Sequence, residues 1–184
     1  MNKRSLIAIP LFVLLTASVI WLWVSPGGIS RAPDIKLTIT DGSIIDLQQL
    51  RGKPVLITFW ATSCKGCIRE MPHLIALYDE LSDDGLEIIG IAMPYDPPNQ
   101  VVKMISEKKI PYPIAIDIEG NAVLAFGGVI VTPTSFLIAP DGTIAKHKIG
   151  EMDMHELRST IISMLPNQNI VGNFHQVPVP ASSS

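Results

Sequence analysis

Hydrophobic positions in this chain follow two different patterns. One uninterrupted apolar segment covers residues 5–24, and from about residue 34 onward short apolar runs alternate with amphipathic stretches. Short runs rich in β-branched and aromatic residues predict strands, whereas apolar residues repeated every three or four positions predict helices. The pattern therefore predicts a membrane-spanning segment followed by an α/β domain.

The N-terminal segment 5–24 contains no charged residue, and 16 of its 20 residues are Ala, Val, Ile, Leu, Phe or Trp. A helix of that length spans about 30 Å, the thickness of a bilayer core. Lys3 and Arg4 precede it, which favours a cytoplasmic N-terminus and export of the rest. Trp21 and Trp23 stand where a signal-peptide cleavage site needs small residues, so the sequence favours an uncleaved anchor over a cleaved signal.

The region 34–166 predicts one domain in which a βαβ half is followed by a ββα half. A continuous apolar run over 55–60 indicates a strand buried on both faces, and a single apolar stripe indicates a helix over 65–81. Further strands are expected at about 35–40, 86–93, 114–116, 134–139 and 143–149, and further helices at 98–109, 119–126 and 152–165, with Val101, Val102 and Ile105 facing inward. The predicted fold class is α/β, a mixed sheet flanked by helices.

The domain is bordered by segments without periodic patterning. Residues 1–24 are expected to form a short cytoplasmic stub and the anchor, and the Gly- and Pro-rich segment 25–33 a linker. Residues 167–184, which end in a low-complexity stretch, are expected to form a disordered tail.

Composition supports this division of the chain. The mean hydropathy of +0.35 is high for a soluble domain, and the segment 5–24 accounts for much of it. The net charge is −3, whereas nucleic-acid-binding proteins usually contain an excess of basic residues, so no nucleic-acid partner is expected.

The chain has two cysteines, Cys64 and Cys67, placed where the predicted strand 55–60 turns into the predicted helix 65–81. A thiol at a helix N-terminus faces unpaired backbone N–H groups and the positive end of the helix dipole, both of which stabilise a thiolate. The spacing lets the two sulfurs close a small disulfide ring, whose opening and closing moves two electrons. Cys64 is expected to be the attacking nucleophile and Cys67 the resolving thiol.

Other uses of the two sulfurs are less favoured. Two cysteines do not complete a zinc site, and the four histidines (His73, His147, His155 and His175) show no paired ligand spacing, so no metal is expected. A purely structural disulfide suits an oxidising compartment, but so short a ring constrains the unfolded chain little. The strand–CxxC–helix placement therefore favours redox chemistry, with the disulfide itself as the redox group and no further cofactor.

Three motifs carry a resemblance to a known family. Residues 60–67, Trp-Ala-Thr-Ser-Cys-Lys-Gly-Cys, resemble the active site of the thioredoxin superfamily, and Glu70-Met71-Pro72 is similar to its membrane-anchored TlpA/ResA-like branch. Residues 131–134, Val-Thr-Pro-Thr, resemble the superfamily's cis-proline segment. The match spans residues 34–165 and implies a thioredoxin-like fold.

The resemblance also implies roles for residues around the cysteines. Pro133 would follow a cis peptide bond and face the disulfide, leaving backbone groups of Thr132 to pair with a substrate strand. Trp60 would shield the sulfurs and contribute to substrate binding. A trans proline at a strand entrance and a tryptophan that belongs only to the core are the plainer alternatives.

The segments that flank Cys67 bear on proton and electron transfer. Glu70, one turn further along the helix, would have a raised pKa if it were desolvated and could then handle the proton during resolution; as a solvated carboxylate it would not. Both interpretations stay open. Thioredoxin has a buried Asp six residues before its first active-site cysteine, and the residue at that position here is Thr58, which makes Glu70 the favoured proton-handling residue. Lys65 should favour the Cys64 thiolate, while Gly66 in place of the usual proline loosens the helix start and leaves the direction of electron flow open.

These features predict an extracytoplasmic, membrane-tethered thiol–disulfide oxidoreductase of the bacterial inner membrane. Family analogy implies that it reduces protein disulfides, for example in cytochrome c maturation, with electrons from a membrane donor. A disulfide oxidase or isomerase, and a copper-binding chaperone that uses the same two sulfurs, are the alternatives.

Overall fold

The computed structural model describes Thr16 and residues 30–166. The predicted anchor over 5–24, apart from Thr16, and the predicted tail over 167–184 lie outside the described residues. Among the residues that are described, no helix is long and apolar enough to cross a bilayer.

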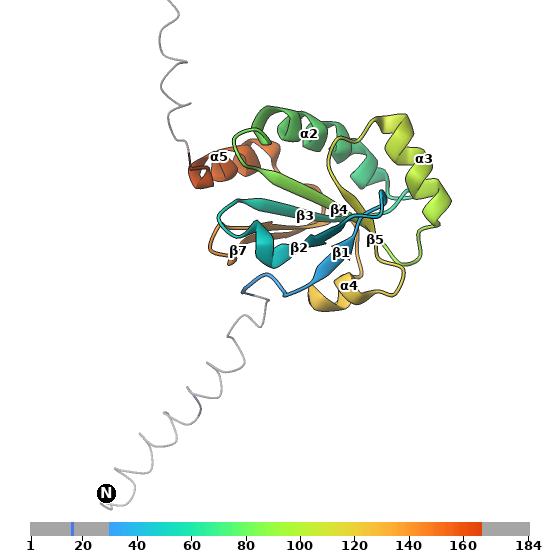
Figure 1. Ribbon diagram of the computed structural model, residues 1–184, viewed down its shortest axis with the longest axis horizontal. Helices are drawn as coiled ribbons and strands as arrows, with labels where there is room; N and C mark the ends of the chain where they lie inside the picture. Colours follow the sequence, from blue (N-terminus) through green and yellow to red (C-terminus); the bar gives the residue numbers. More distant parts are fainter. Residues whose placement is uncertain (1–15, 17–29, 167–184) are drawn as a thin grey trace, which may run out of the picture.

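A five-stranded sheet in the order β5-β4-β3-β6-β7 forms the centre of the domain (Figure 1). Its strands are β3 (Val55–Trp60), β4 (Glu87–Ala92), β5 (Ile114–Ile116), β6 (Thr134–Ile138) and β7 (Ile144–Ile149). β3, β4 and β5 run parallel, whereas β6 is antiparallel to both β3 and β7. The sheet is mixed, as predicted, and β3 lies at its middle.

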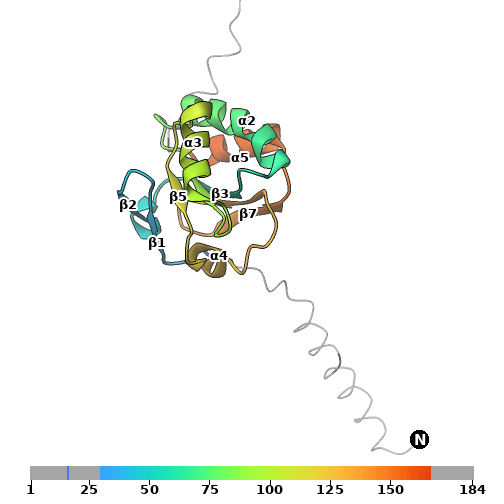
Figure 2. The ribbon, with the colours of Figure 1, turned by 90° about the vertical axis from the view of Figure 1, so that its right-hand side faces the viewer.

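Helices cover one face of the sheet, and a smaller layer covers the other (Figures 1 and 2). The first layer contains α2 (Lys65–Leu81), α3 (Pro98–Lys108) and α5 (Met154–Met164). The second contains α4 (Asn121–Ala125), the hairpin of β1 (Lys36–Thr38) and β2 (Ile44–Asp46), and the short 3₁₀ helix Leu47–Leu50. Because β3 is sandwiched between the layers, all six of its residues are buried.

The two faces of β3 belong to two hydrophobic clusters. Leu56 and Trp60 pack toward α2 and α5, whereas Ile57 and Phe59 pack toward α4 and the β1–β2 hairpin. This alternation follows from the two-residue period of a strand. It holds the C-terminal end of β3, from which the cysteine loop departs, between two packed layers.

One predicted core position is wrong. Val101 is buried beneath α3 and Ile105 is half-buried, but Val102 is 52% exposed. α3 packs on the domain with one stripe only, and Val102 lies 100° around the helix from Val101, outside that stripe. Hydrophobicity alone could not distinguish the two neighbouring valines.

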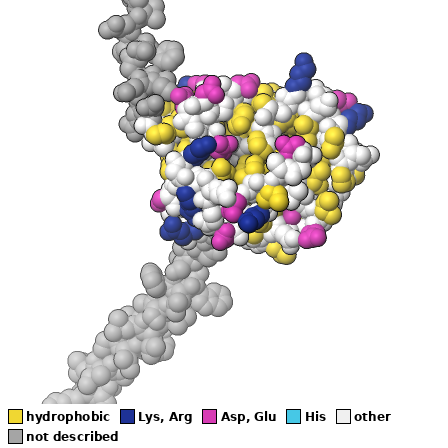
Figure 3. Space-filling model, viewed as in Figure 1, with side chains coloured by type: hydrophobic (Ala, Val, Ile, Leu, Met, Phe, Trp, Pro, Cys, Tyr) yellow, Lys and Arg dark blue, Asp and Glu magenta, His cyan; other side chains and the backbone are white. Residues whose placement is uncertain are grey.

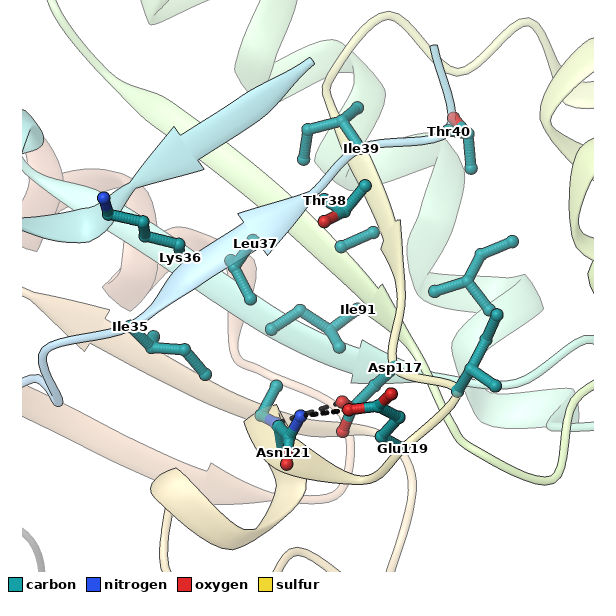
Figure 4. Close-up of a pocket in the computed structure, with 14 residues that line it drawn as sticks. Ile35, Lys36, Leu37, Thr38, Ile39, Thr40, Ile91, Asp117, Glu119 and Asn121 are labelled. Carbon is teal, nitrogen blue, oxygen red and sulfur yellow. Dashed lines mark hydrogen bonds between the residues drawn. The ribbon is translucent and has the colours of Figure 1, made fainter. Parts of the chain in front are cut away.

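A cleft of about 470 Å³ opens between β1 and the segment after β5 (Figure 4). Ile39, directly after β1, forms an isolated antiparallel bridge with Ala115 of β5. Asp117 lies at this cleft with both carboxylate oxygens occupied, since they accept hydrogen bonds from the backbone N–H groups of Ala122 and Val123. Neither cysteine lines the cleft, so the redox chemistry lies elsewhere. Figure 3 shows this face of the molecule with apolar side chains between scattered acidic and basic ones.

Candidate active site

Cys64 and Cys67 form a disulfide at the N-terminus of α2, with an S–S distance of 2.10 Å and a Cα–Cα distance of 5.3 Å. Cys64 is the N-cap residue, and its sulfur accepts a hydrogen bond from the Cys67 backbone N–H at 3.1 Å. The helix therefore offers a backbone N–H donor to the sulfur that the sequence predicts as nucleophile.

The two sulfurs differ in accessibility. Cys64 is partly exposed, whereas Cys67 is buried and belongs to the core cluster beneath α2. An external disulfide can therefore reach Cys64 more readily than Cys67. This asymmetry suits an attacking and a resolving thiol.

The Thr132–Pro133 peptide bond is cis, and Pro133 lies close to Gly66 between the two cysteines. A Cβ placed on Gly66 would lie 3.3 Å from Pro133 Cδ and 3.3 Å from Glu151 Oε1. The glycine between the cysteines thus allows a close approach of the proline, and a larger side chain would have to displace a neighbour. The structure brings Pro133, which follows Thr132 through the cis bond, close to Gly66 between the two cysteines, while Lys65 is exposed at the same helix end.

Glu70 is buried, with 3% of its surface exposed, and one carboxylate oxygen accepts a 2.7 Å hydrogen bond from the Met152 backbone N–H. Burial raises the pKa of Glu70, the charge of Glu151 raises it further, and the Met152 hydrogen bond opposes this shift. Glu70 and Cys67 line the same small internal cavity. Of the two interpretations left open by the sequence, the solvated carboxylate is wrong.

Trp60 is a core residue close to Cys67. It is buried, lines the same small cavity as Cys67, and its indole Nε1 has no hydrogen-bond partner within the described part of the chain. The ring packs toward Gly90, where a Cβ would lie 3.1 Å from Nε1. Trp60 therefore contributes to the packed interior next to Cys67.

A protein-family model described as the AhpC/TSA family matches residues 30–147, which is more than half of the chain. The chain belongs to the AhpC/TSA family.

Among curated proteins, this AhpC/TSA chain is similar to "Thiol-disulfide oxidoreductase ResA" of Bacillus thuringiensis. The two are 36% identical over 137 residues, which cover 74% of this chain and 78% of that protein. It is also 35% identical to "Protein DipZ" of Mycobacterium bovis over 83% of this chain, but over only 23% of that much longer protein. With the Cys64–Cys67 pair in place, this AhpC/TSA protein is a thiol–disulfide oxidoreductase.

Solved structures agree on the fold. The crystal structure of StoA from Bacillus subtilis matches with a TM-score of 0.59 and 28% identity, covering 68% of this chain and 93% of that one. A thiol:disulfide interchange protein of the thioredoxin family from Chlorobium tepidum matches with a TM-score of 0.68 and 23% identity, over 76% and 99% of the two chains. The predicted thioredoxin-like fold is confirmed.

Three residues around the cysteine loop and the cavity behind Cys67 in this AhpC/TSA protein were not predicted from the sequence. Glu151, in the loop after β7, forms an ion pair with Arg69 of α2 beside Gly66. Tyr112 lines the cavity behind Cys67, and burial raises the pKa of its phenol. Asp96 follows β4 and bonds to the loop before Cys64. All three come from segments remote in sequence, and no local motif marks them.

Replacing Glu70 with glutamine is expected to slow resolution of the mixed disulfide by about 10²-fold, because the amide cannot take up the Cys67 proton. The amide oxygen can still accept the Met152 hydrogen bond, so the fold should be retained. Single-turnover release of the second substrate thiol measures this step. Unchanged release rates would contradict a proton-handling role.

The same variant tests the raised pKa of Glu70 through stability. A raised folded-state pKa contributes stability that is complete below the ordinary value of 4.5 and is lost as the pH rises through the folded pKa. Glu70→Gln has no ionisable group at this position and does not lose this stability. The free energy of unfolding of the variant minus that of the wild type should therefore increase as the pH rises from 4.5 through the folded-state pKa of Glu70. Denaturant titrations at several pH values measure the difference, and parallel curves would contradict the raised pKa.

Proposed function

We propose that this thiol–disulfide oxidoreductase works as a reductase of protein disulfides outside the cytoplasmic membrane. The observation that carries the proposal is the arrangement of a partly exposed Cys64, a buried Cys67 and a buried Glu70 around one helix end, facing the Thr132–Pro133 segment. The similarity to a curated ResA protein supports it.

The reaction begins with the dithiol form of the protein. The Cys64 thiolate attacks one sulfur of the substrate disulfide, so that a mixed disulfide forms and the other substrate sulfur leaves as a thiolate. The Cys67 thiol then gives its proton to Glu70, and its thiolate attacks the Cys64 sulfur. The Cys64–Cys67 disulfide forms, the second substrate thiolate leaves, and solvent and Glu70 supply the protons that the two thiolates take up. The substrate gains two electrons, and the protein loses two.

Substrate binding is assigned to the surface beside the cysteines. Thr132 is partly exposed next to the buried Pro133, so its backbone is available to an extended substrate segment. Trp60, which lines the internal cavity next to Cys67, is assigned a part in forming this surface, and Gly66 allows Pro133 to approach the segment between the cysteines. Lys65 is the exposed cation adjacent to Cys64 and favours its thiolate.

The predicted anchor 5–24 would tether the domain to the bacterial inner membrane and hold it in the periplasm or an equivalent extracytoplasmic space. A tether raises the effective concentration of the domain near membrane partners. We propose that a thiol-reducing membrane protein returns electrons to the disulfide and that cytochrome c maturation supplies substrates. Tagging each end of the full chain and testing protease access in spheroplasts would check this topology.

Replacing Cys67 with serine is expected to trap substrates. Cys64 would still attack, but the serine hydroxyl cannot displace the bound sulfur, so mixed disulfides through Cys64 should accumulate in cells. Non-reducing gels and mass spectrometry identify the trapped proteins. The matched control is the double variant Cys64→Ser/Cys67→Ser, which should trap none; equal trapping by both would contradict the assigned roles.

The direction of electron flow is tested by the reduction potential of the Cys64–Cys67 couple, measured against glutathione or dithiothreitol. A reductase requires a potential well below that of DsbA, about −120 mV. A value close to −120 mV would overturn the reductase assignment in favour of a disulfide oxidase.

A further inference from the structure

Asp96 is a buried carboxylate, 4% exposed, in the loop between β4 and α3. Its Oδ2 accepts a 2.7 Å hydrogen bond from the Thr62 backbone N–H, and its Oδ1 accepts a 2.5 Å bond from the Thr62 hydroxyl. Both oxygens therefore act as acceptors, as an ionised carboxylate does. Among residues 30–166, no cationic side chain forms an ion pair with Asp96.

The residue that Asp96 binds lies in the turn that leads to the nucleophile. The Cys64 backbone N–H donates to the Ala61 carbonyl at 3.0 Å, which closes a four-residue turn with Thr62 as its second residue. Thr62 and Cys64 are two residues apart, which limits their Cα–Cα distance to about 7 Å, so the carboxylate bound to Thr62 lies within roughly 12 Å of the Cys64 backbone. An unpaired buried charge acts over such a distance because little solvent screens it.

We propose that Asp96 is a positioning and electrostatic residue that keeps the Cys64–Cys67 couple reducing. Its negative charge disfavours the Cys64 thiolate, raises the pKa of that thiol and so destabilises the reduced form of the protein relative to the disulfide. A couple whose reduced form is destabilised gives up its electrons more readily. The inference deepens the proposed reductase function and rests on it.

Other charged groups near the disulfide also affect the stability of the Cys64 thiolate. Lys65 is the exposed cation next to Cys64, and Arg69 is already paired with Glu151. Glu70, on the Cys67 side, is buried with a raised pKa. Among these groups Lys65 favours the Cys64 thiolate, and the charge of Asp96 opposes that effect.

Replacing Asp96 with asparagine tests the proposal, because the amide oxygen still accepts the Thr62 N–H bond while the charge is removed. The pH dependence of alkylation should show the Cys64 pKa lowered by about one unit, a tenfold change in the thiolate equilibrium. The equilibrium constant with glutathione should shift toward the reduced protein. That shift should be absent at pH values below the thiol pKa and rise to about tenfold, or about 30 mV, above it.

Asp117→Asn is the matched control. Asp117 is also a buried carboxylate, 8% exposed, that accepts two backbone N–H bonds, but it lies beside the cleft of Figure 4 rather than beside the disulfide. It should change stability without changing the Cys64 pKa or the redox equilibrium. Equal effects of both substitutions would overturn the proposal, and so would a redox shift in Asp96→Asn that is independent of pH, because that would indicate a displaced loop.

A second variant keeps the test valid if Asp96→Asn does not fold. Gln100 is exposed, and its side-chain oxygen lies 3.3 Å from the Thr62 hydroxyl, so Gln100→Lys brings a cation to Asp96 without altering it. It should change the Cys64 pKa and the redox equilibrium in the same direction as Asp96→Asn. An unchanged thiol pKa in this folded variant would overturn the inference. The potential of the unaltered protein tests the reductase function, whereas these differences between variants test the role of Asp96.

Discussion

Replacing Cys64 with serine is expected to abolish exchange with protein disulfides, with a loss on the order of 10³-fold or more. Cys64 is the partly exposed sulfur at the N-terminus of α2, whereas Cys67 is buried in the core. A serine hydroxyl is not ionised at neutral pH and forms no disulfide. The buried Cys67 cannot take over, because an external disulfide would have to enter the packed interior to reach it.

This loss is measured as thiol release from a reduced enzyme mixed with a disulfide-bonded protein. Ser63→Ala is the matched control, since Ser63 is an exposed neighbour in the same turn, and its activity should remain within about twofold of the wild type. Substantial exchange by Cys64→Ser would show that another group is the nucleophile.

Replacing Phe59 with alanine is expected to cost about 3–5 kcal/mol of unfolding free energy. Phe59 is fully buried on β3 and packs edge-on against Phe126 at 5.4 Å and Phe136 at 6.1 Å between ring centroids. Its removal would leave a cavity between the central strand and α4. Because most domains are stable by only about 5–15 kcal/mol, such a loss would leave the variant close to unfolding.

Urea titration of the oxidised protein measures the change, with the midpoint expected to fall and the slope to stay constant. Leu124→Ala is the matched control: this α4 residue is 72% exposed, so truncation should change the unfolding free energy by no more than about 0.5 kcal/mol. A cost below about 1 kcal/mol for Phe59→Ala would contradict the cluster as a source of stability.

Much of the fold could be predicted because its strongest signals are local. The predicted helix 65–81 and strand 114–116 agree with α2 and β5. Other boundaries move by one or two residues, as between the predicted helix 98–109 and Pro98–Lys108. Periodicity reports which face of an element is apolar, and it fails where two apolar neighbours such as Val101 and Val102 face different environments.

The site was predicted in part for the same reason. The two cysteines and Pro133 belong to motifs that are readable in sequence, whereas the environment of Glu70 depends on Met152 and Glu151, more than 80 residues away. Asp96 is 34 residues from Thr62, and only the parallel pairing of β3 with β4 brings the loops after them together. Long-range contacts of this kind leave no spacing that a single sequence reveals.

The segment 150–152 contacts both the Pro133 segment and α2, and this affects how a substrate can bind. Gly150 donates its N–H to the Pro133 carbonyl, Glu151 pairs with Arg69, and Met152 donates to Glu70. These contacts therefore connect the segment that contains Pro133 to α2, the helix whose N-cap is Cys64. We expect a substrate segment that binds beside Pro133 to require little ordering of the enzyme, because these contacts already hold the residues around it in place. Affinity and selectivity would then depend mainly on how readily the substrate's own chain around its disulfide becomes extended.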